Sequence, residues 1–232
     1  MPRVARAVRR SLCYHIFNRG LNRQVIFRDD KDREHFTRLV LRYKQNCTAK
    51  VYHWAWMDTH YHMLAEVPFE YLRVFAGGVQ QAYAQYHHAR HGTSGVFWQG
   101  RFRSEPVEVG DYLARCGRYI ERNPVRGGVV EVAWEYPWSS AAFYVRGTDD
   151  GLTDVDLYIA ADGMTPRDRE IYGSVLMSSD DDEWMLKQNE RRVIGGEVFR
   201  ARVKTQGGRH RAKRGRQAHL RILPHKALNA NK

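Results

Sequence analysis

Residues 51–67, VYHWAWMDTHYHMLAEV, constrain the fold more than any other stretch of the chain. Aromatic and apolar side chains alternate on both sides of the dipeptide Asp58-Thr59. This pattern predicts two β-strands that are joined by a tight turn. We expect the rest of the chain to be organised around these two strands.

The second of these strands opens with His60-Tyr61-His62. Successive side chains of a strand point to opposite faces, so the two imidazoles share one face, about 7 Å apart along the strand. Two imidazoles in this arrangement can bind one divalent ion. A His-x-His pair is also expected by chance in a chain with 11 histidines, so the spacing alone leaves metal binding open.

Apolar periodicity predicts the elements on either side of this hairpin. The expected strands are residues 12–17 and 106–109, and the expected helices are residues 30–45, 71–91 and 112–122, the second weakened at Gly77-Gly78. The order strand, helix, strand, strand, helix, strand, helix predicts an α+β sandwich, in which helices pack on an antiparallel sheet. Two shorter helices are expected at residues 166–176 and 184–193.

His87 and His91 form a second candidate metal pair, because they lie four residues apart on the helix over residues 71–91. Their place at a helix end, before Gly92, is more typical of capping or solvated groups.

The net charge of +12 is unevenly distributed along the chain. Residues 149–183 hold eleven acidic side chains and two arginines, whereas residues 200–232 hold eleven Lys or Arg and no acid. We therefore divide the chain into a domain at 1–148, an acidic connecting segment at 149–183 and a basic C-terminal region at 184–232. From residue 207 onward we expect a flexible, disordered tail.

A basic chain favours a polyanionic partner, most commonly nucleic acid, and the tail is expected to add salt-sensitive affinity. A solvated tail without a partner is the alternative. No apolar run approaches the ~20 residues of a membrane span, so no membrane partner is expected. Three widely spaced cysteines and the lack of a signal-peptide pattern predict a cytoplasmic protein.

The helix after Asp111 carries Cys116, Tyr119 and Asn123 along one side. If this side faces His60 and His62, the Tyr119 phenol lies beside the ion, and Asn123 adds an oxygen ligand or holds a water. A metal and a tyrosine together can cut a phosphodiester through a covalent phosphotyrosine. By pattern alone, however, a half-buried core tyrosine is the commoner case, since the chain has 13 tyrosines and Tyr112 shares this helix side.

Several segments resemble one family. They are HYH at residues 60–62, YHIFNRG at 14–20, FWQGRFRS at 97–104, RYIERNPVRGG at 118–128 and WSS at 138–140. In this order, over about residues 12–146, the chain resembles the REP-associated branch of the single-tyrosine HUH transposases, where HUH stands for His, hydrophobic, His. The resemblance implies a ferredoxin-like HUH nuclease fold. It also implies a metal-dependent single-strand DNA endonuclease and strand transferase that acts on hairpin DNA of repetitive extragenic palindromes through a 5′-phosphotyrosine.

The resemblance assigns Tyr119 as the nucleophile, and His60, His62 and Asn123 as ligands of Mg²⁺ or Mn²⁺. Family members commonly carry Pro-Asn before the first histidine, where this chain has Asp58-Thr59. The substitution adds a carboxylate near the expected ion.

The expected DNA contacts combine amide, aromatic and basic side chains, which bind phosphates and stack on bases. They are Asn18, Arg19, Arg23, Trp98, Gln99, Arg101, Arg103, Arg126, Lys213, Arg214 and Arg216. A buried core tryptophan would give the same sequence pattern as Trp98. The segment KRGRQ at residues 213–217 resembles an AT-hook core with Gln217 in place of proline, so phosphate binding is the safer expectation.

Two other functions fit the same basic surfaces. One is a regulatory protein that binds hairpin DNA without cutting it, and the other is a metal hydrolase in which water attacks. The sequence leaves open whether the protein is a monomer or a homodimer.

Overall fold

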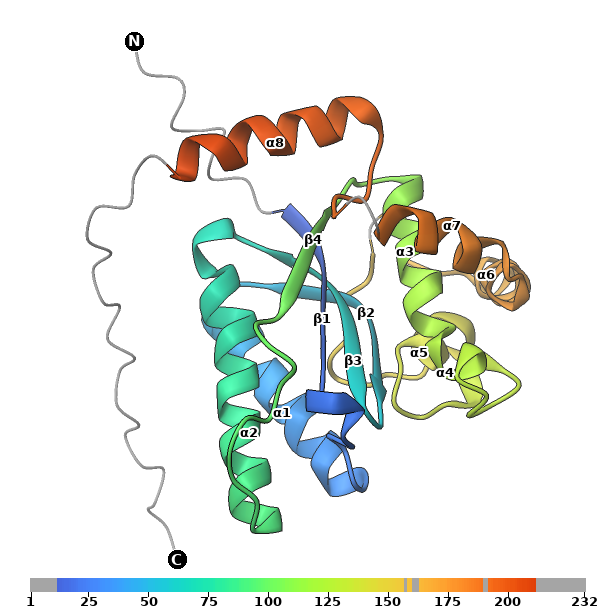
Figure 1. Ribbon diagram of the computed structural model, residues 1–232. Coiled ribbons are helices and arrows are strands. Elements are labelled where there is room, and N and C mark those ends of the chain that lie inside the picture. Colours follow the sequence, from blue (N-terminus) through green and yellow to red (C-terminus); the bar gives the residue numbers. More distant parts are fainter. Residues whose placement is uncertain (1–11, 157, 160–162, 190–191, 212–232) are drawn as a thin grey trace, which may run out of the picture.

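The computed structural model describes residues 12–156, 158–159, 163–189 and 192–211, and every structural statement below refers to these residues. Four antiparallel strands form one sheet in the order β2-β3-β1-β4 (Figure 1). The strands are β1 (Leu12–Arg19), β2 (Lys50–Met57), β3 (His60–Val67) and β4 (Arg103–Val107). With α1 (Asp30–Asn46) after β1 and α2 (Gly78–His91) after β3, this is the ferredoxin-like arrangement, and the predicted α+β fold is confirmed.

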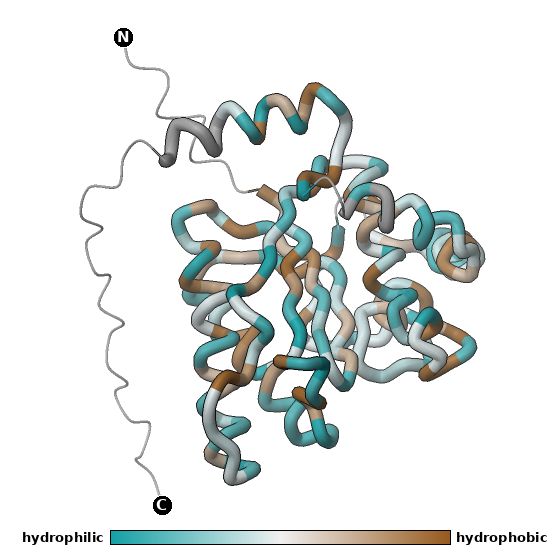
Figure 2. The backbone as a smooth tube through the Cα atoms, in the orientation of Figure 1, coloured by the Kyte–Doolittle hydropathy of each residue, from teal (hydrophilic) through white to brown (hydrophobic). Residues whose placement is uncertain are grey.

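Helices α1 and α2 cover one face of the sheet (Figure 1). The aromatic side chains of Phe36, Trp56, Tyr61 and Tyr83 are fully buried there and contact one another edge to face or tilted. Along the helices, hydrophobic and hydrophilic residues alternate, as expected for amphipathic helices with one buried side (Figure 2). This aromatic core explains the alternation that predicted the hairpin.

The weak point at Gly77-Gly78 is a π-helical turn, η4 (Arg73–Gly77), which leads into α2. A Cβ at Gly78 would overlap the Tyr43 ring of α1, so the two helices approach closely only because this residue is glycine. Helix α2 ends at Gly92, which has a left-handed conformation with φ of 63°.

The second face of the sheet is covered by α3 (Asp111–Glu121) together with further helices (Figure 1). These are α4 (Asn123–Arg126), α5 (Ala141–Arg146), α6 (Pro166–Met177) and α7 (Asp180–Asn189), and the 3-10 turns of the chain are η2 (Leu21–Arg23), η3 (Phe69–Tyr71) and η5 (Ala133–Glu135). The described part of the acidic segment is folded onto the body of the protein: Tyr172 and Leu176 of α6 are buried against α5, and Leu152 is buried in the core on the α1 and α2 side.

Several predicted boundaries differ from the observed ones, and three of the differences have a clear physical context. Strand β4 begins at Arg103 rather than residue 106, because pairing with β1 continues from Cys13 to Phe17, and Pro106 is tolerated on an edge strand. Helix α7 begins at Asp180 rather than residue 184, with four acidic residues in its first turn, where the helix dipole favours them.

A third difference concerns the C-terminal tail, which was expected to be disordered from residue 207. Helix α8 (Glu197–Arg211) continues through Gly207 and Gly208, although glycine disfavours helix. The rest of the expected tail, residues 212–232, lies outside the described residues. No helix in the described part of the chain is long and apolar enough to cross a bilayer.

Candidate functional site

His60 and His62 lie at the start of β3 and both face α3. Their ring centroids are 5.2 Å apart. Residues of β1 and β2 flank them in register, with Phe17 on one side of His62 and Ala55 on the other. The strand alternation that predicted a shared face therefore places both imidazoles beneath the second half of α3.

Tyr119 comes from α3 and lies over this pair. Its side chain is 5 % exposed, and its ring centroid is 6.2 Å from that of His62. The Arg126 guanidinium lies over the Tyr119 ring, with Cζ 4.0 Å from the centroid. The rival residue Tyr112 instead packs against Trp184 near the start of α3. Of the two tyrosines on this helix side, Tyr119 is the one beside the histidines.

A third histidine, His15 on β1, belongs to the same group and was missed from the sequence. Its Nε2 lies 2.9 Å from Nδ1 of His62, and the two rings stack with centroids 5.1 Å apart. Phe17 stacks on His15 at 4.6 Å and on His62 at 5.5 Å. The alternation of residues 12–17 places His15 and Phe17 on one face, but only the pairing of β1 with β3 shows that this face is that of His62.

The three imidazoles are held neutral by their surroundings. Burial, together with the positive charges of Arg103 and Arg126, lowers the pKa of His15 to about 3. Burial also lowers the pKa of His62 well below its usual value, with His15 and His60 as further causes. Burial likewise lowers the pKa of His60, and the positive charge of Arg126 contributes. Neutral imidazoles keep the lone pair that a metal ligand needs.

The hydrogen bonds of the two predicted ligands also suit metal binding. Nδ1 of His62 is bound to His15, and Nδ1 of His60 lies 3.0 Å from the Thr59 hydroxyl. Each ring therefore has its Nδ1 engaged by another side chain, and its Nε2 remains as the ligand atom. This is the arrangement in which metal-binding histidines are usually oriented.

Asn123 follows α3 at its C-terminal end, and its amide is fixed by three contacts. Nδ2 donates to the carbonyl oxygens of Tyr119 and Ile120, both at 3.1 Å, and Oδ1 accepts from Arg126 at 2.9 Å. The Asn123 side chain also interacts with that of His60, so the amide lies beside one of the two predicted histidine ligands. The nearby carboxylate of Asp58 pairs with Arg33 of α1, so it is held by the opposite layer.

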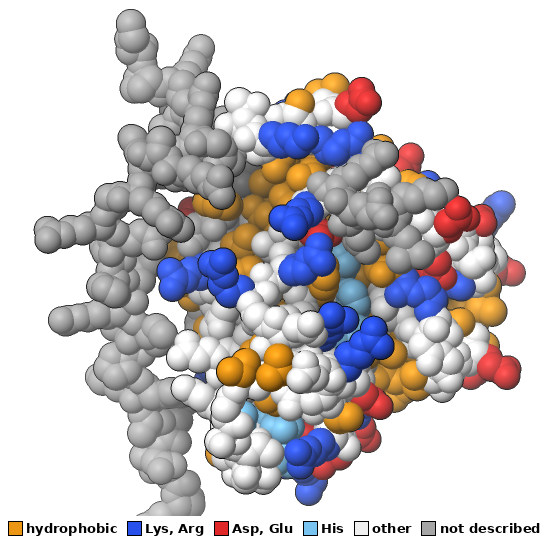
Figure 3. Space-filling view, viewed as in Figure 1, with side chains coloured by type: hydrophobic (Ala, Val, Ile, Leu, Met, Phe, Trp, Pro, Cys, Tyr) orange, Lys and Arg blue, Asp and Glu red, His pale blue; other side chains and the backbone are white. Residues whose placement is uncertain are grey.

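The expected DNA-binding residues that the structure describes divide into two groups. Those in the first group are exposed: Arg19, Arg23, Gln99, Arg101, Arg103 and Arg126. Lysine and arginine side chains surround histidines at the centre of the face shown in Figure 3, while acidic side chains gather over α6 and α7. Lys213, Arg214 and Arg216 lie outside the described residues.

Asn18 and Trp98 form the second group, because the structure buries them on the α2 side. Trp98 is 9 % exposed, its indole nitrogen donates to the Gln80 carbonyl at 3.0 Å, and its ring contacts Tyr61. Asn18 donates to the Gly100 carbonyl at 3.0 Å. Both side chains anchor the loop that carries Gln99 and Arg101.

The acidic residues of α7 pair with arginines of the helix that carries Tyr119. Asp181 accepts from Arg115 and Arg118, both at 2.6 Å. Asp182 accepts from Arg122 at 3.0 Å and lies 3.5 Å from Arg126. The acidic segment thus neutralises part of the basic surface next to the candidate site, which the sequence did not show.

A separate buried network holds the other side of α3. Nδ1 of His53 lies 2.8 Å from Glu121, whose carboxylate also accepts from Ser140 at 2.6 Å and from Tyr172 at 2.7 Å. Asp156 lies 3.6 Å from Nε2 of His53. Glu121 and Ser140 both belong to segments of the family resemblance, and the structure gives them this packing role.

A ferredoxin-like sheet with a His-x-His strand beneath a tyrosine-bearing helix defines the class of fold and site. Comparison with family models gives the family: the model described as "Transposase IS200 like" matches residues 8–123. The chain therefore belongs to the IS200-like transposase family.

Among solved structures, the chain is similar to a REP-associated tyrosine transposase bound to a REP hairpin. The two share 18 % sequence identity with a TM-score of 0.48, over 63 % of this chain and 85 % of that one. No curated protein matches the chain.

Proposed function

We propose that this transposase is a single-strand DNA endonuclease and strand transferase of the REP-associated branch, with Tyr119 as its nucleophile and hairpin DNA as its substrate. The main support is the position of Tyr119 on α3: its ring centroid lies 6.2 Å from that of His62, at one end of the sheet. The assignment to the REP-associated branch is supported by the sequence segments around Gly20, Trp98, Asn123 and Ser140. Such a function predicts a cytoplasmic location at the nucleoid.

The donor set fits a divalent ion. Nε2 of His60, Nε2 of His62 and Oδ1 of Asn123 would hold Mg²⁺ or Mn²⁺, since imidazole and amide oxygen suit several such ions. When bound, the ion would polarise a non-bridging phosphate oxygen and stabilise the charge that develops during attack.

The Tyr119 phenol oxygen attacks the scissile phosphorus. The new bond joins the tyrosine oxygen to phosphorus, and the broken bond releases a 3′ hydroxyl, so the 5′ phosphate stays on the protein. The reverse attack by a 3′ hydroxyl rejoins the strand, which makes the intermediate suitable for strand transfer. Arg126, which lies over the Tyr119 ring and bonds to Asn123, is placed to pair with the phosphate.

His15 acts in this proposal as a positioning residue. When Nδ1 of His62 donates to Nε2 of His15, the lone pair of His62 stays on its own Nε2. The opposite tautomer would place a proton on the proposed ligand atom. The contact between β1 and β3 therefore decides whether His62 is ready to bind a cation.

The exposed Arg19, Arg23, Gln99, Arg101 and Arg103 are proposed to contact the DNA backbone around this site. Asp181 and Asp182 then compete with phosphate for the arginines of α3. Binding of the hairpin would replace carboxylates by phosphates on the same guanidinium groups.

The test is a denaturing gel of labelled single-stranded hairpin DNA with the protein and Mn²⁺, Mg²⁺ or a chelator. The proposal expects a metal-dependent covalent adduct that Tyr119→Phe abolishes and Tyr112→Phe, its matched control on the same helix, retains. Cleavage without an adduct would indicate water attack instead. Tight binding with neither product would indicate a DNA-binding protein that does not cut.

A further inference from the structure

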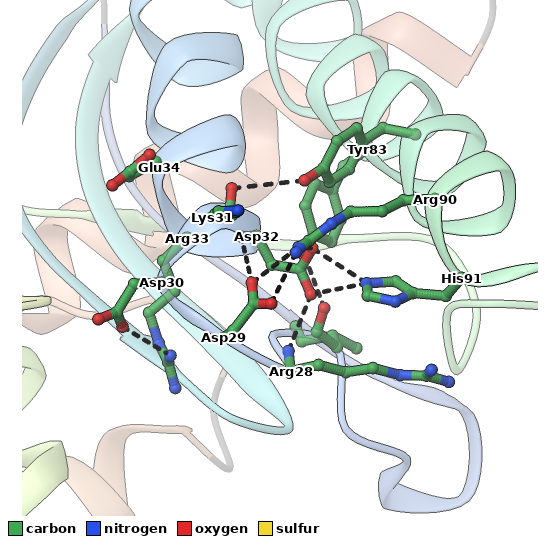
Figure 4. Close-up of polar contacts among 12 residues, drawn as sticks. Arg28, Asp29, Asp30, Lys31, Asp32, Arg33, Glu34, Tyr83, Arg90 and His91 are labelled. Atoms are coloured by element: carbon green, nitrogen blue, oxygen red, sulfur yellow. Dashed lines mark hydrogen bonds and ion pairs between the residues drawn. The ribbon is translucent and has the colours of Figure 1, made fainter.

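A second group of metal-ligating side chains lies between α1 and α2, on the opposite face of the sheet from His60 and His62. Asp32 comes from the first turn of α1, and His87 and His91 lie one turn apart near the end of α2. One ligand atom from each residue can be chosen so that all three lie within 4.8 Å of one another. Figure 4 shows Asp32 directed toward His91 and Arg90 from the neighbouring helix.

One member of this group, His87, has no hydrogen bond that explains its burial. Its side chain is 3 % exposed, and both ring nitrogens are buried without a partner among the described residues. Buried polar atoms are nearly always paired, so an orphaned imidazole beside a buried carboxylate points to a missing ligand. Asp32 itself is fully buried, and its two oxygens lie 3.0 and 3.1 Å from Nε2 of His91.

The donor set has the chemistry of a zinc site. Two histidines at i and i+4 on one helix and a carboxylate from a second helix supply three ligands, and water completes a tetrahedral site. Two imidazoles and one carboxylate form a donor set that suits Zn²⁺. Burial lowers the pKa of His87 to about 4, with the neighbouring His91 contributing, so the ring is neutral near pH 7.

The surrounding charges allow a cation. Asp29 and Asp32 both face the Arg90 guanidinium, which contacts Asp29 at 2.6 Å and also pairs with Asp32 (Figure 4). The two carboxylates offset the positive charges of Arg90 and of Arg28, which also acts on His87, so the cluster carries no net positive charge when the imidazoles are neutral. The backbone amide of Arg28 donates to Asp32 at 2.9 Å. These bonds orient the carboxylate from outside, as partners of metal-binding carboxylates commonly do.

We propose that Asp32, His87 and His91 bind a Zn²⁺-type ion that fastens α1 to the end of α2. The position has a consequence for the loop that follows, because the Phe97 ring lies 4.6 Å from the His87 ring. The ion would fix the base of the segment that carries Trp98, Gln99 and Arg101. This inference is independent of the proposed nuclease chemistry.

The experiment uses the full-length chain without a histidine tag, first treated with a chelator and then dialysed. Zn²⁺ binding is measured by calorimetry, Co²⁺ coordination by its visible absorption, and Tm with and without Zn²⁺. The His60→Ala/His62→Ala double variant removes the other candidate site. In that background we expect one Zn²⁺ per chain, a tetrahedral Co²⁺ spectrum, and a Tm increase on the order of 5–10 °C at a free concentration 100-fold above Kd.

His87→Ala in the same background should lose the binding isotherm, the Co²⁺ spectrum and the Tm increase, while the matched control His88→Ala should keep all three. His91→Gln is the second variant, because its amide can still donate to Asp32 while it is a poor zinc ligand. Unchanged Zn²⁺ stoichiometry and Tm increase in His87→Ala or in a folded His91→Gln would overturn the proposal. Loss of all binding in the His60→Ala/His62→Ala protein would also overturn it.

Discussion

Two sites on the same sheet face, beneath α3, differ in the charge of their histidines. The neutral group consists of His15, His60 and His62, and the charged group consists of His53 with Glu121 and Asp156. Burial, with a contribution from two arginines, lowers the pKa of His15 to about 3. Burial also opposes the charged form of His53, but Glu121 and Asp156 overcome it and raise its pKa to about 9. Both side chains are fully buried. The comparison shows that the neighbouring charges, and not burial, decide which imidazole is charged.

Strand register keeps the two groups apart. His15 on β1 and His53 on β2 both face Leu64 of β3, so one apolar side chain separates them. Helix α3 approaches His53 closely at Gly117, where a Cβ would lie 2.6 Å from the imidazole ring. The charged group thus fixes the helix that carries Tyr119, while the neutral group offers lone pairs beside it.

The largest difference should appear in activity. His62→Ala removes a proposed ligand from the neutral group, so we expect adduct formation on hairpin DNA to fall to background. His88→Ala, on the other side of the sheet, is the control and should retain adduct formation. Adducts at the wild-type level in His62→Ala would remove the neutral group from the mechanism.

In the charged group, replacing the histidine by alanine should lower the free energy of unfolding. His53→Ala leaves Glu121 and Asp156 buried without their cation, at an expected cost of about 3–5 kcal/mol. Urea unfolding followed by circular dichroism measures this. A loss below about 1 kcal/mol would show that the pair contributes no more than an exposed one.

The charged group also predicts a pH dependence of the free energy of unfolding. The pKa of His53 is raised in the folded state, so its stabilisation is complete below about pH 6.5, the unfolded value, and is lost as the pH rises through about 9. The expected loss is on the order of 3 kcal/mol, the free-energy equivalent of the shift. Urea unfolding from pH 6 to 10 should show it in the wild type, and His53→Gln should have a flatter profile. Equal slopes for the two proteins would contradict the assignment.

A smaller effect tests the positioning role of His15. His15→Phe removes the acceptor of the His62 Nδ1 proton, whereas the side-chain oxygen of His15→Gln can still accept it. We expect Mn²⁺ affinity to fall by about 10–100-fold in His15→Phe and to recover at least partly in His15→Gln. Equal losses in both variants would indicate packing alone.

The smallest effect concerns the acidic helix. Asp181→Asn/Asp182→Asn frees arginines of α3 that the two carboxylates pair with, at a few tenths to about 1 kcal/mol per pair. Hairpin DNA should therefore bind a few-fold more tightly at low salt, and fluorescence anisotropy measures this. Asp168→Asn on α6, which only caps that helix, is the control. Unchanged or weaker affinity would show that α7 does not compete with DNA.

The sequence predicted those parts of the fold that depend on local pattern. The hairpin, α1, α3 and the shared face of His60 and His62 follow from alternation and helical periodicity. Tyr119 required the family resemblance, because Tyr112 has the same helical spacing. His15, His53 and the ion pairs of Asp181 and Asp182 depend on strand register or on helix packing, which no local pattern contains. Trp98 shows that a local pattern can also be ambiguous, since the same sequence fits a side chain that stacks on bases and one that is buried in the core.

The most direct test of the central claim is to locate the covalent link. Wild-type protein that has reacted with single-stranded hairpin DNA and Mn²⁺ is digested with nuclease and protease, and the peptides are analysed by mass spectrometry. We predict a nucleotide attached through a 5′ phosphate to Tyr119, the tyrosine beside the neutral histidines. A nucleotide on Tyr112 or on any other residue would contradict this account of the site.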